Sequence, residues 1–198
     1  MSFYAVSSTS NCIASSQHHI ASDIANASEL HTRFSKRDLS TYSYNLRFLG
    51  SFGLVGPDGR WIEVTRKKSI ALLALLATGI NGERWRSWLQ EKLWGSLEPQ
   101  CSQAALRREI YYLRRLGNVY QIPLLIANYR VVKLNISVVN IDFLSREVDE
   151  YDEFLEGFSL LGEPEFGYWL KKTRQNISKS MTINSNISAR AAALRGHL

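Results

Sequence analysis

The stretch SQAALRREIYYLRRLG, residues 102–117, concentrates the side chains with the most distinctive chemistry in the chain. It carries two Arg-Arg pairs and two adjacent tyrosines but only one acidic residue. Arginine presents a rigid fork of donors that fits a phosphate group or the O6 and N7 atoms of guanine, and tyrosine adds an apolar plate with a hydroxyl. These residue types are suited to the major groove of DNA, although arginine-rich helix faces also occur simply as solvated surfaces.

The apolar residues of this stretch repeat with the period of an α-helix. With Leu106 at zero and about 100 degrees per residue, Ile110 and Leu113 fall within roughly 40 degrees of it and define a buried stripe. We therefore expect a helix over Gln100–Leu116, in which the small Ala104 lets the helix approach base edges closely. The residues expected to read bases on its outward side are Gln103, Ala104, Arg107, Arg108, Tyr111 and Arg115.

The residues before this helix predict a hairpin followed by a buried helix. Near-alternating apolar residues on either side of Gly50, with a Pro-Asp-Gly turn at 57–59, are typical of short antiparallel strands. In residues 65–82 the repeated leucines make most of two faces apolar, as expected of a helix in the centre of a small domain. Gly82 and the residues just before it end that helix.

Two further elements are expected on either side of the basic helix. Residues 84–95 have apolar positions at three-to-four spacing, which predicts a second amphipathic helix. The β-branched and apolar runs of 122–134 predict a second hairpin, with its tip near Ala127 and Asn128, where a left-handed backbone is tolerated.

Short helix, polar turn, basic helix and hairpin, in that order, form the plan of a winged helix-turn-helix domain. In this plan Arg84 and Arg86 stand at the N-terminal end of the supporting helix, where guanidinium and backbone N–H groups can hold one phosphate. Residues of the hairpin lie on the wing, over the neighbouring minor groove or backbone. The expected contacts to the DNA backbone are Lys67, Lys68, Arg84, Arg86, Arg114, Tyr129, Arg130 and Lys133.

The composition sets limits on the class of protein. A chain of 198 residues with 45% hydrophobic residues and a net charge of +6 suits one small domain with appendages. The longest apolar run, 69–80, is shorter than the roughly 20 residues that cross a bilayer, and the N-terminus has no signal-peptide pattern. Cys12 and Cys101 have no Cys or His at ligand spacing, so we expect reduced thiols, no metal site and a cytoplasmic, nucleoid-associated location.

Patterns that carry catalysis or cofactor binding are missing from the sequence. It has no glycine-rich phosphate loop and no His-x-x-x-His pair, and the stretch GFSLLG does not have nucleophile-elbow spacing. The adjacent His18 and His19 fall in a Ser-rich segment with no apolar period. We expect no enzyme activity and no cofactor.

The sequence divides into four segments. Residues 1–44 predict a disordered arm, 45–136 a winged-helix domain, 137–177 an acidic segment and 178–198 a flexible tail that is either frayed or a short terminal helix. The charge reverses beyond Asn140, since 142–165 holds nine acidic residues and one arginine.

The segments LRFLGSFGLVGPDGRWIEVTRKKSIALLALLA, LQEKLWG, SQAALRREIYYLRRLG and NYRVVKL together resemble the winged-helix DNA-binding domain of the SARP (Streptomyces antibiotic regulatory protein) family, which is itself similar to the OmpR/PhoB type. The resemblance covers residues 46–134. It implies an α+β fold with a small N-terminal antiparallel sheet, three helices, a C-terminal hairpin wing and here a short C-terminal helical extension. It also implies a bacterial transcription regulator that binds double-stranded DNA, in this family often as a dimer on direct repeats.

The segments NIDFLSREV and DEFLEGFSLLGEPEFGYWLKKTRQNI are similar to pieces of the bacterial transcriptional activator domain that follows the winged helix in that family. The helices that usually lie between and after these pieces are missing or reduced here. We expect this segment to pack its aromatic residues against the winged helix, and these residues are Phe143, Phe154, Phe158, Phe166 and Trp169.

The sequence is compatible with two functions, DNA binding and protein interaction. The leading hypothesis is a sequence-specific DNA-binding transcriptional regulator that reads the major groove with helix 100–116. The alternative is a protein-interaction module or antagonist that binds a partner regulator or RNA polymerase through the acidic segment 142–165. A basic helix covered by that acidic segment would favour the alternative.

Overall fold

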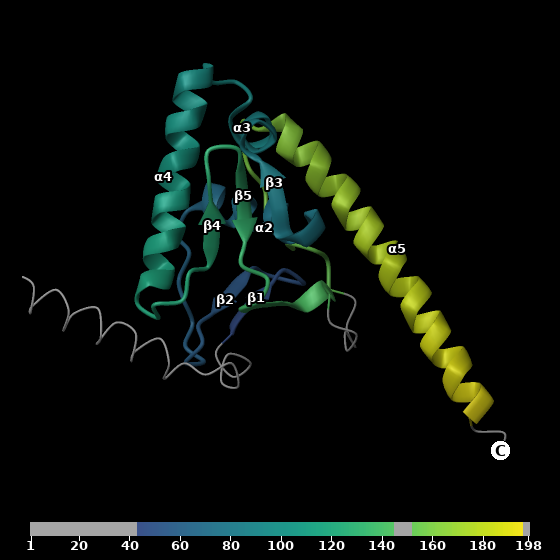
Figure 1. Cartoon of the computed structure of the whole chain (residues 1–198). Coiled ribbons are helices and arrows are strands. Elements are labelled where there is room, and N and C mark those ends of the chain that lie inside the picture. The colour runs from purple at the N-terminus through teal and green to yellow at the C-terminus, as the bar shows by residue number, and fades with distance from the viewer. Residues whose placement is uncertain (1–42, 145–151, 196–198) are drawn as a thin grey trace, which may run out of the picture. The chain divides into compact units, whose positions relative to one another are not determined.

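Two three-stranded sheets and four α-helices make up the part of the chain that the structure describes, residues 43–144 and 152–195 (Figure 1). The structure is a computed structural model, and it describes side-chain surroundings as far as Ser180. The α+β class predicted from the sequence is confirmed. The predicted arm over 1–44 lies outside the described residues except for its last two positions.

The first sheet joins the start of the domain to residues far along the chain. Its order is β2-β1-β6, with β1 at Tyr44–Arg47, β2 at Gly53–Val55 and β6 at Val139–Ile141. β1 and β2 are antiparallel, and the connection contains Gly50 at φ 71°, a conformation that glycine adopts without steric cost. β6 runs parallel to β1, a pairing that the sequence did not predict.

The second sheet has the order β3-β5-β4 and is antiparallel throughout. β4 (Leu125–Ala127) and β5 (Val131–Leu134) form the hairpin predicted over 122–134. β3 (Glu83–Trp85) was not predicted, because the helical pattern was taken to begin at residue 84. Arg84 therefore lies on a strand and not at the start of a helix.

The helices α2 (Lys67–Ala77), α3 (Arg86–Trp94) and α4 (Pro99–Asn118) follow the order expected from the sequence. Proline at the first position of α4 has the φ angle of a helix and needs no hydrogen-bond donor there. Short 3-10 turns follow α2 at Ile80–Gly82 and follow β6 at Asp142–Leu144.

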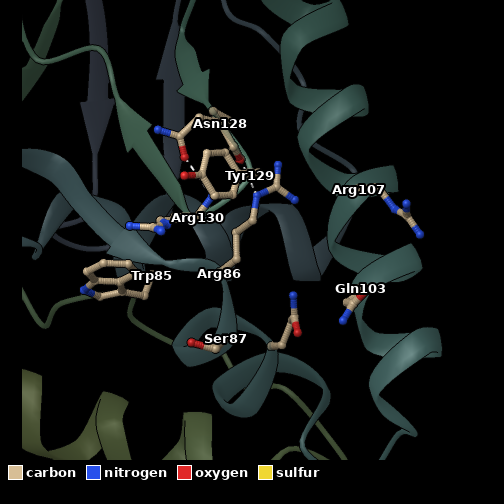
Figure 2. A pocket seen from close by; sticks show the side chains of 10 residues that line it. Trp85, Arg86, Ser87, Gln103, Arg107, Asn128, Tyr129 and Arg130 are labelled. Atoms are coloured by element: carbon tan, nitrogen blue, oxygen red, sulfur yellow. Dashed lines mark hydrogen bonds between the residues drawn. The ribbon is translucent and has the colours of Figure 1, made fainter.

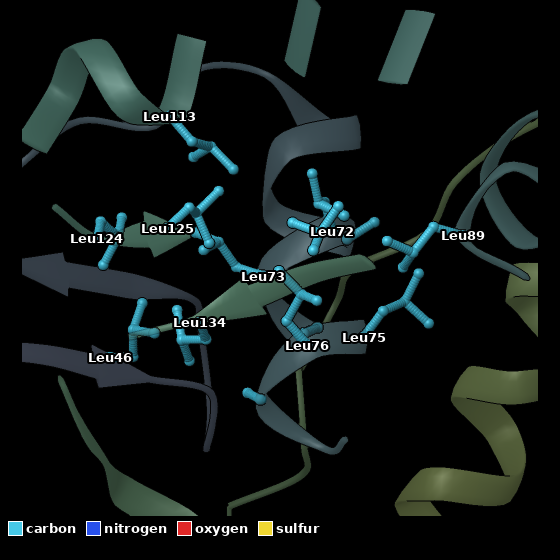
Figure 3. Close-up of a cluster of buried hydrophobic side chains, with 14 of the residues drawn as sticks. Leu46, Leu72, Leu73, Leu75, Leu76, Leu89, Leu113, Leu124, Leu125 and Leu134 are labelled. Carbon is cyan, nitrogen blue, oxygen red and sulfur yellow. The ribbon is translucent and has the colours of Figure 1, made fainter. Parts of the chain in front are cut away.

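The leucines of α2 form the centre of the hydrophobic core (Figure 3). Leu72, Leu73, Leu75 and Leu76 are fully buried, in agreement with the prediction of a central helix with two apolar faces. Burying each such side chain contributes about 1.5–3 kcal/mol. Leu113 of α4 joins this core, so the core fixes the axis of the basic helix.

An aromatic cluster attaches the C-terminal segment to the first sheet. Phe48 stacks on Phe154 with ring centroids 5.6 Å apart, Phe143 packs on both, and Trp169 meets Phe154 edge-on at 6.4 Å. Phe158 and Phe166 also pack against the core, so the expected role of these aromatic residues is confirmed.

The last helix, α5 (Pro164–Arg195), continues through most of the segment for which the sequence predicted a flexible tail. Ion pairs and hydrogen bonds hold its beginning. Glu165 accepts from Lys92 of α3 at 2.6 Å, and Glu163, just before the helix, pairs with Lys68 of α2. Arg174 donates to the main-chain oxygens of Phe154 and Leu155. Among the described helices, none combines the length and apolarity that a bilayer crossing requires.

Candidate nucleic-acid interface

The outward face of α4 is cationic and open to solvent. Leu106, Ile110 and Leu113 are buried, which confirms the predicted stripe. Ala104 is half-buried. Tyr111 is 65% exposed. The other residues predicted to read bases or phosphates from this helix are all exposed: Gln103, Arg107, Arg108, Arg114 and Arg115.

The only acidic residue of α4 does not share this face. The side chain of Glu109 is 14% exposed and accepts a hydrogen bond from the hydroxyl of the buried Ser69 on α2. Its second oxygen lies 3.5 Å from a guanidinium nitrogen of Arg66. On a helical projection Glu109 falls about 60 degrees from Leu106, at the border of the buried stripe. This angle is the sequence signal from which its position away from the outward face could have been predicted.

A groove lies between the start of α3, the side of α4 and the β4–β5 turn (Figure 2). In Figure 2 the side chain of Arg86 extends from the first residue of α3 toward the turn that carries Asn128, with Gln103 and Arg107 on the neighbouring α4. Among the described residues, the lining contains no carboxylate. Its members are Trp85, Arg86, Ser87, Gln90, Gln103, Arg107, Ala127, Asn128, Tyr129 and Arg130.

Guanidinium groups from two helices meet at the carbonyl groups of this turn. Arg86 donates from Nε to the oxygen of Asn128 at 2.7 Å, and Arg114 donates from Nη2 to the oxygen of Ala127 at 3.3 Å. Burial lowers the pKa of Arg86, and the positive charges of Arg114 and Arg107 lower it further. The three cations repel one another, so an anion placed among them gains favourable interactions with all three.

The turn itself has a defined conformation. The side-chain oxygen of Asn128 accepts from the backbone N–H groups of Arg130 and Val131, both at 2.8 Å. Asn128 is not among the residues with positive φ, so the left-handed backbone that this residue type tolerates is not adopted here, and the side-chain hydrogen bonds close the turn instead. Tyr129 is 80% exposed, and the guanidinium of Arg130 lies over its ring at 5.1 Å.

Among the described residues, no carboxylate forms an ion pair with the cations on the outward face of α4 or in the groove. Within residues 43–144 and 152–180, the ion pairs involve Arg60, Arg66, Lys68, Lys92 and Arg174. None of them involves Arg86, Arg107, Arg108, Arg114, Arg115 or Arg130. A concave surface with one sign of charge attracts polyanions and raises their rate of association.

Besides Arg86 and Arg114, two further predicted phosphate-binding residues have partners inside the protein. Arg84 donates to the oxygens of Leu75 and Thr78 at 3.2 and 3.0 Å, which satisfies carbonyl groups at the end of α2. Its guanidinium lies 4.8 Å from the ring centre of Trp88, and burial lowers its pKa. The ammonium group of Lys68 donates to the main-chain oxygen of Leu93 and forms an ion pair with Glu163.

The remaining predicted residues occupy separate positions. Lys67 is exposed at the first position of α2, and Lys133 is half-buried on β5, opposite Glu83 in the register. Sequence reasoning missed Arg66, which lies beside α4 and lines a second groove with four residues of its outward face. The described residues contain no cluster of His, Cys, Asp and Glu suited to a metal ion.

No protein-family model matches the chain, and no curated protein sequence matches it. Among solved structures, it is similar to EmbR of Mycobacterium tuberculosis, determined in complex with a low-affinity phosphopeptide, at 23% sequence identity and a TM-score of 0.42. The match covers 50% of this chain and 27% of that one, so the chain spans about a quarter of the EmbR chain.

Proposed function

We propose that this protein is a sequence-specific DNA-binding transcriptional regulator with a winged helix-turn-helix fold. α3 is the supporting helix, α4 is the recognition helix in the major groove, and the β4–β5 hairpin is the wing. The protein binds double-stranded DNA without catalysing a reaction. A homodimer on direct repeats is the arrangement that the resemblance implies.

The observation that carries this proposal is a set of guanidinium groups on one side of the molecule that have no carboxylate partner among the described residues. Arg107, Arg108 and Arg115 point outward from α4, and Arg86 and Arg114 lie beside the wing. A helix about 10–12 Å across fits a major groove of about 12 Å. Arginines at its centre then face base edges, and those on its flanks face phosphates.

The alternative of an interaction module based on the acidic segment has less support. In the described part of that segment, Glu163 and Glu165 pair with lysines of α2 and α3, and Glu153 pairs with Arg174. These carboxylates stabilise the attachment of α5. The arginines at the centre of α4 stay exposed, as a DNA-binding helix requires.

A salt titration of duplex binding tests the proposal. Anisotropy of a labelled mixed-sequence duplex should give log Kobs that falls linearly with log salt, by about 0.9 for each phosphate neutralised. Selection of bound sequences from a random DNA pool should then enrich one motif, with half-site spacing if the protein acts as a dimer. Absence of duplex binding at low salt contradicts the proposal, and binding without an enriched motif contradicts its sequence specificity.

A further inference from the structure

A second groove borders α4 on the side of α2. In the part of the chain that the structure describes, its lining contains four cations and two aromatic rings and has no carboxylate. These residues are Arg66, Arg107, Arg108, Tyr111, Tyr112 and Arg115. Arg66 precedes the first residue of α2, and the other five belong to α4.

Arg66 and the wing lie on opposite flanks of α4. On a helical projection Arg114, which contacts the wing, falls about 80 degrees from Leu106, and Tyr112, which contacts Arg66, falls at about 240 degrees. Arg108 and Arg115 lie between them, at about 200 and 180 degrees. The centre of the outward face therefore has one arginine-bearing groove on each side.

Contacts with α4 hold Arg66 in place. Its guanidinium lies over the ring of Tyr112 at 4.4 Å, and this contact with the ring positions it. Glu109, at 3.5 Å, contacts a single guanidinium nitrogen at the limit of a hydrogen bond. The side chain of Arg66 remains 48% exposed, so most of its five N–H donors are free to bind a ligand.

We propose that Arg66 binds a backbone phosphate on the strand that borders the major groove opposite the wing, and that Tyr112 is the residue that positions it. This inference rests on the proposed function. A helix in the major groove has a phosphate backbone on each side, and the wing flank already provides Arg86 and Arg114 for one of them. Arg66 supplies the contact to the second phosphate backbone, so that α4 is held in the major groove from both sides.

Salt titrations of three variants on the same mixed-sequence duplex test the role of Arg66. Arg66→Gln should weaken binding to all sequences alike and make the slope of log Kobs against log salt shallower by about 0.9. Arg66→Lys keeps the charge and should keep the slope, while the lost fork lowers affinity. The matched control is Arg60→Gln, an exposed arginine paired with Asp58 on the turn after β2, which should bind like the wild type.

Tyr112 variants separate positioning from packing. Tyr112→Leu should reproduce the weaker binding and shallower slope of Arg66→Gln, and it should have no further effect in the Arg66→Gln background. Tyr112→Phe retains the ring and should restore wild-type binding. Additive losses from Tyr112→Leu and Arg66→Gln, or failure of Tyr112→Phe to restore binding, overturn the positioning role. Thermal melting of each variant identifies any loss that comes from unfolding.

Neutral methylphosphonate groups placed one at a time in the duplex locate the contact. Neutralising the phosphate bound by Arg66 should weaken duplex binding by the wild type but not by Arg66→Gln. The same experiment with Arg114→Gln should identify a phosphate on the other side of the major groove. Wild-type slope and affinity in Arg66→Gln, or the same phosphate for both variants, overturn the inference. If the wild type fails to bind duplex at all, the proposed function itself fails.

Discussion

Arg86, the first residue of α3, is bonded to both ends of the β4–β5 turn. Its Nε donates to the main-chain oxygen of Asn128 at 2.7 Å, and its backbone N–H donates to the oxygen of Arg130 at 2.8 Å. The hairpin therefore has a fixed position relative to the helix pair before any ligand binds. A preformed arrangement of this kind lowers the entropy lost on binding.

Replacement of Arg86 by alanine should affect the turn and the phosphate contact together. Alanine has no side-chain donor for the main-chain oxygen of Asn128, so we expect faster amide hydrogen exchange in the β4–β5 turn and a salt slope shallower by about 0.9. Mass-spectrometric exchange and anisotropy measure the two effects. Lys179→Gln, an exposed position on α5, is the control. Unchanged exchange in the turn would show that the Asn128 bond does not hold the hairpin.

Arg108 lies at the centre of the outward face, where base edges are expected. Arg108→Ala should therefore reduce the preference for the selected motif over mixed-sequence DNA by about 1–3 kcal/mol, because a bidentate contact to guanine is lost. Competition binding with both duplexes measures the difference. Equal losses on the two duplexes would assign Arg108 to the backbone.

Tyr44 connects β1 to the end of α4 and should make stability depend on alkaline pH. Its buried hydroxyl donates to the oxygen of Ile122 at 2.8 Å and lies 3.3 Å from that of Gly117. Burial, and to a smaller extent the electrostatic effect of the neighbouring Tyr120, raises the pKa of Tyr44 from 10.0 to about 12. The folded state prefers the neutral hydroxyl of Tyr44. The contribution of this hydroxyl to the free energy of unfolding is therefore complete below pH 10 and is lost as the pH rises toward 12.

The variant Tyr44→Phe should lower the free energy of unfolding by roughly 0.5–1.5 kcal/mol at neutral pH, the usual contribution of a hydrogen bond. Urea denaturation between pH 8 and pH 11 should also show a smaller loss of stability with pH in Tyr44→Phe than in the wild type. Parallel curves for the two proteins would mean that another group is responsible for alkaline unfolding.

Arg174 attaches α5 to the loop that packs against the first sheet. It donates to the oxygens of Phe154 and Leu155 and pairs with Glu153 at 3.2 Å. Arg174→Gln leaves these carbonyl groups without their charged donor, so we expect a loss of about 1.5–3 kcal/mol in the free energy of unfolding. Urea denaturation measures it, with the exposed Lys171→Gln as a control that should change little. A loss no larger than in Lys171→Gln would contradict a role for Arg174 in attaching α5.

Strong local periodicity made the helices predictable from the sequence. The stripe at Leu106, Ile110 and Leu113 places α4 within two residues of its observed ends, and the leucine pattern places α2 at the centre of the core. For the same reason the outward direction of Arg107 and Arg108 could be predicted, since the buried stripe fixes the opposite face.

Elements that depend on distant partners were not predictable in this way. β3 and β6 are three residues long and exist because they pair with β5 and β1, which leaves no local pattern to find. The internal roles of Arg84 and Lys68 likewise depend on carbonyl and carboxylate groups from other elements. A basic residue next to a helix start has the same sequence signature whether it meets a phosphate or a helix C-terminus.

The parallel pairing of β6 with β1 defines the smallest part of the chain that can be expected to fold. A polypeptide ending at residue 136, where the sequence placed the border of the domain, would leave β1 with an open edge and uncover Phe48, whose stacking partner comes from the later segment. Open strand edges promote association between chains. Shortened proteins for crystallisation or binding work should therefore extend at least to Ile177, an apolar residue of α5 that packs on the core.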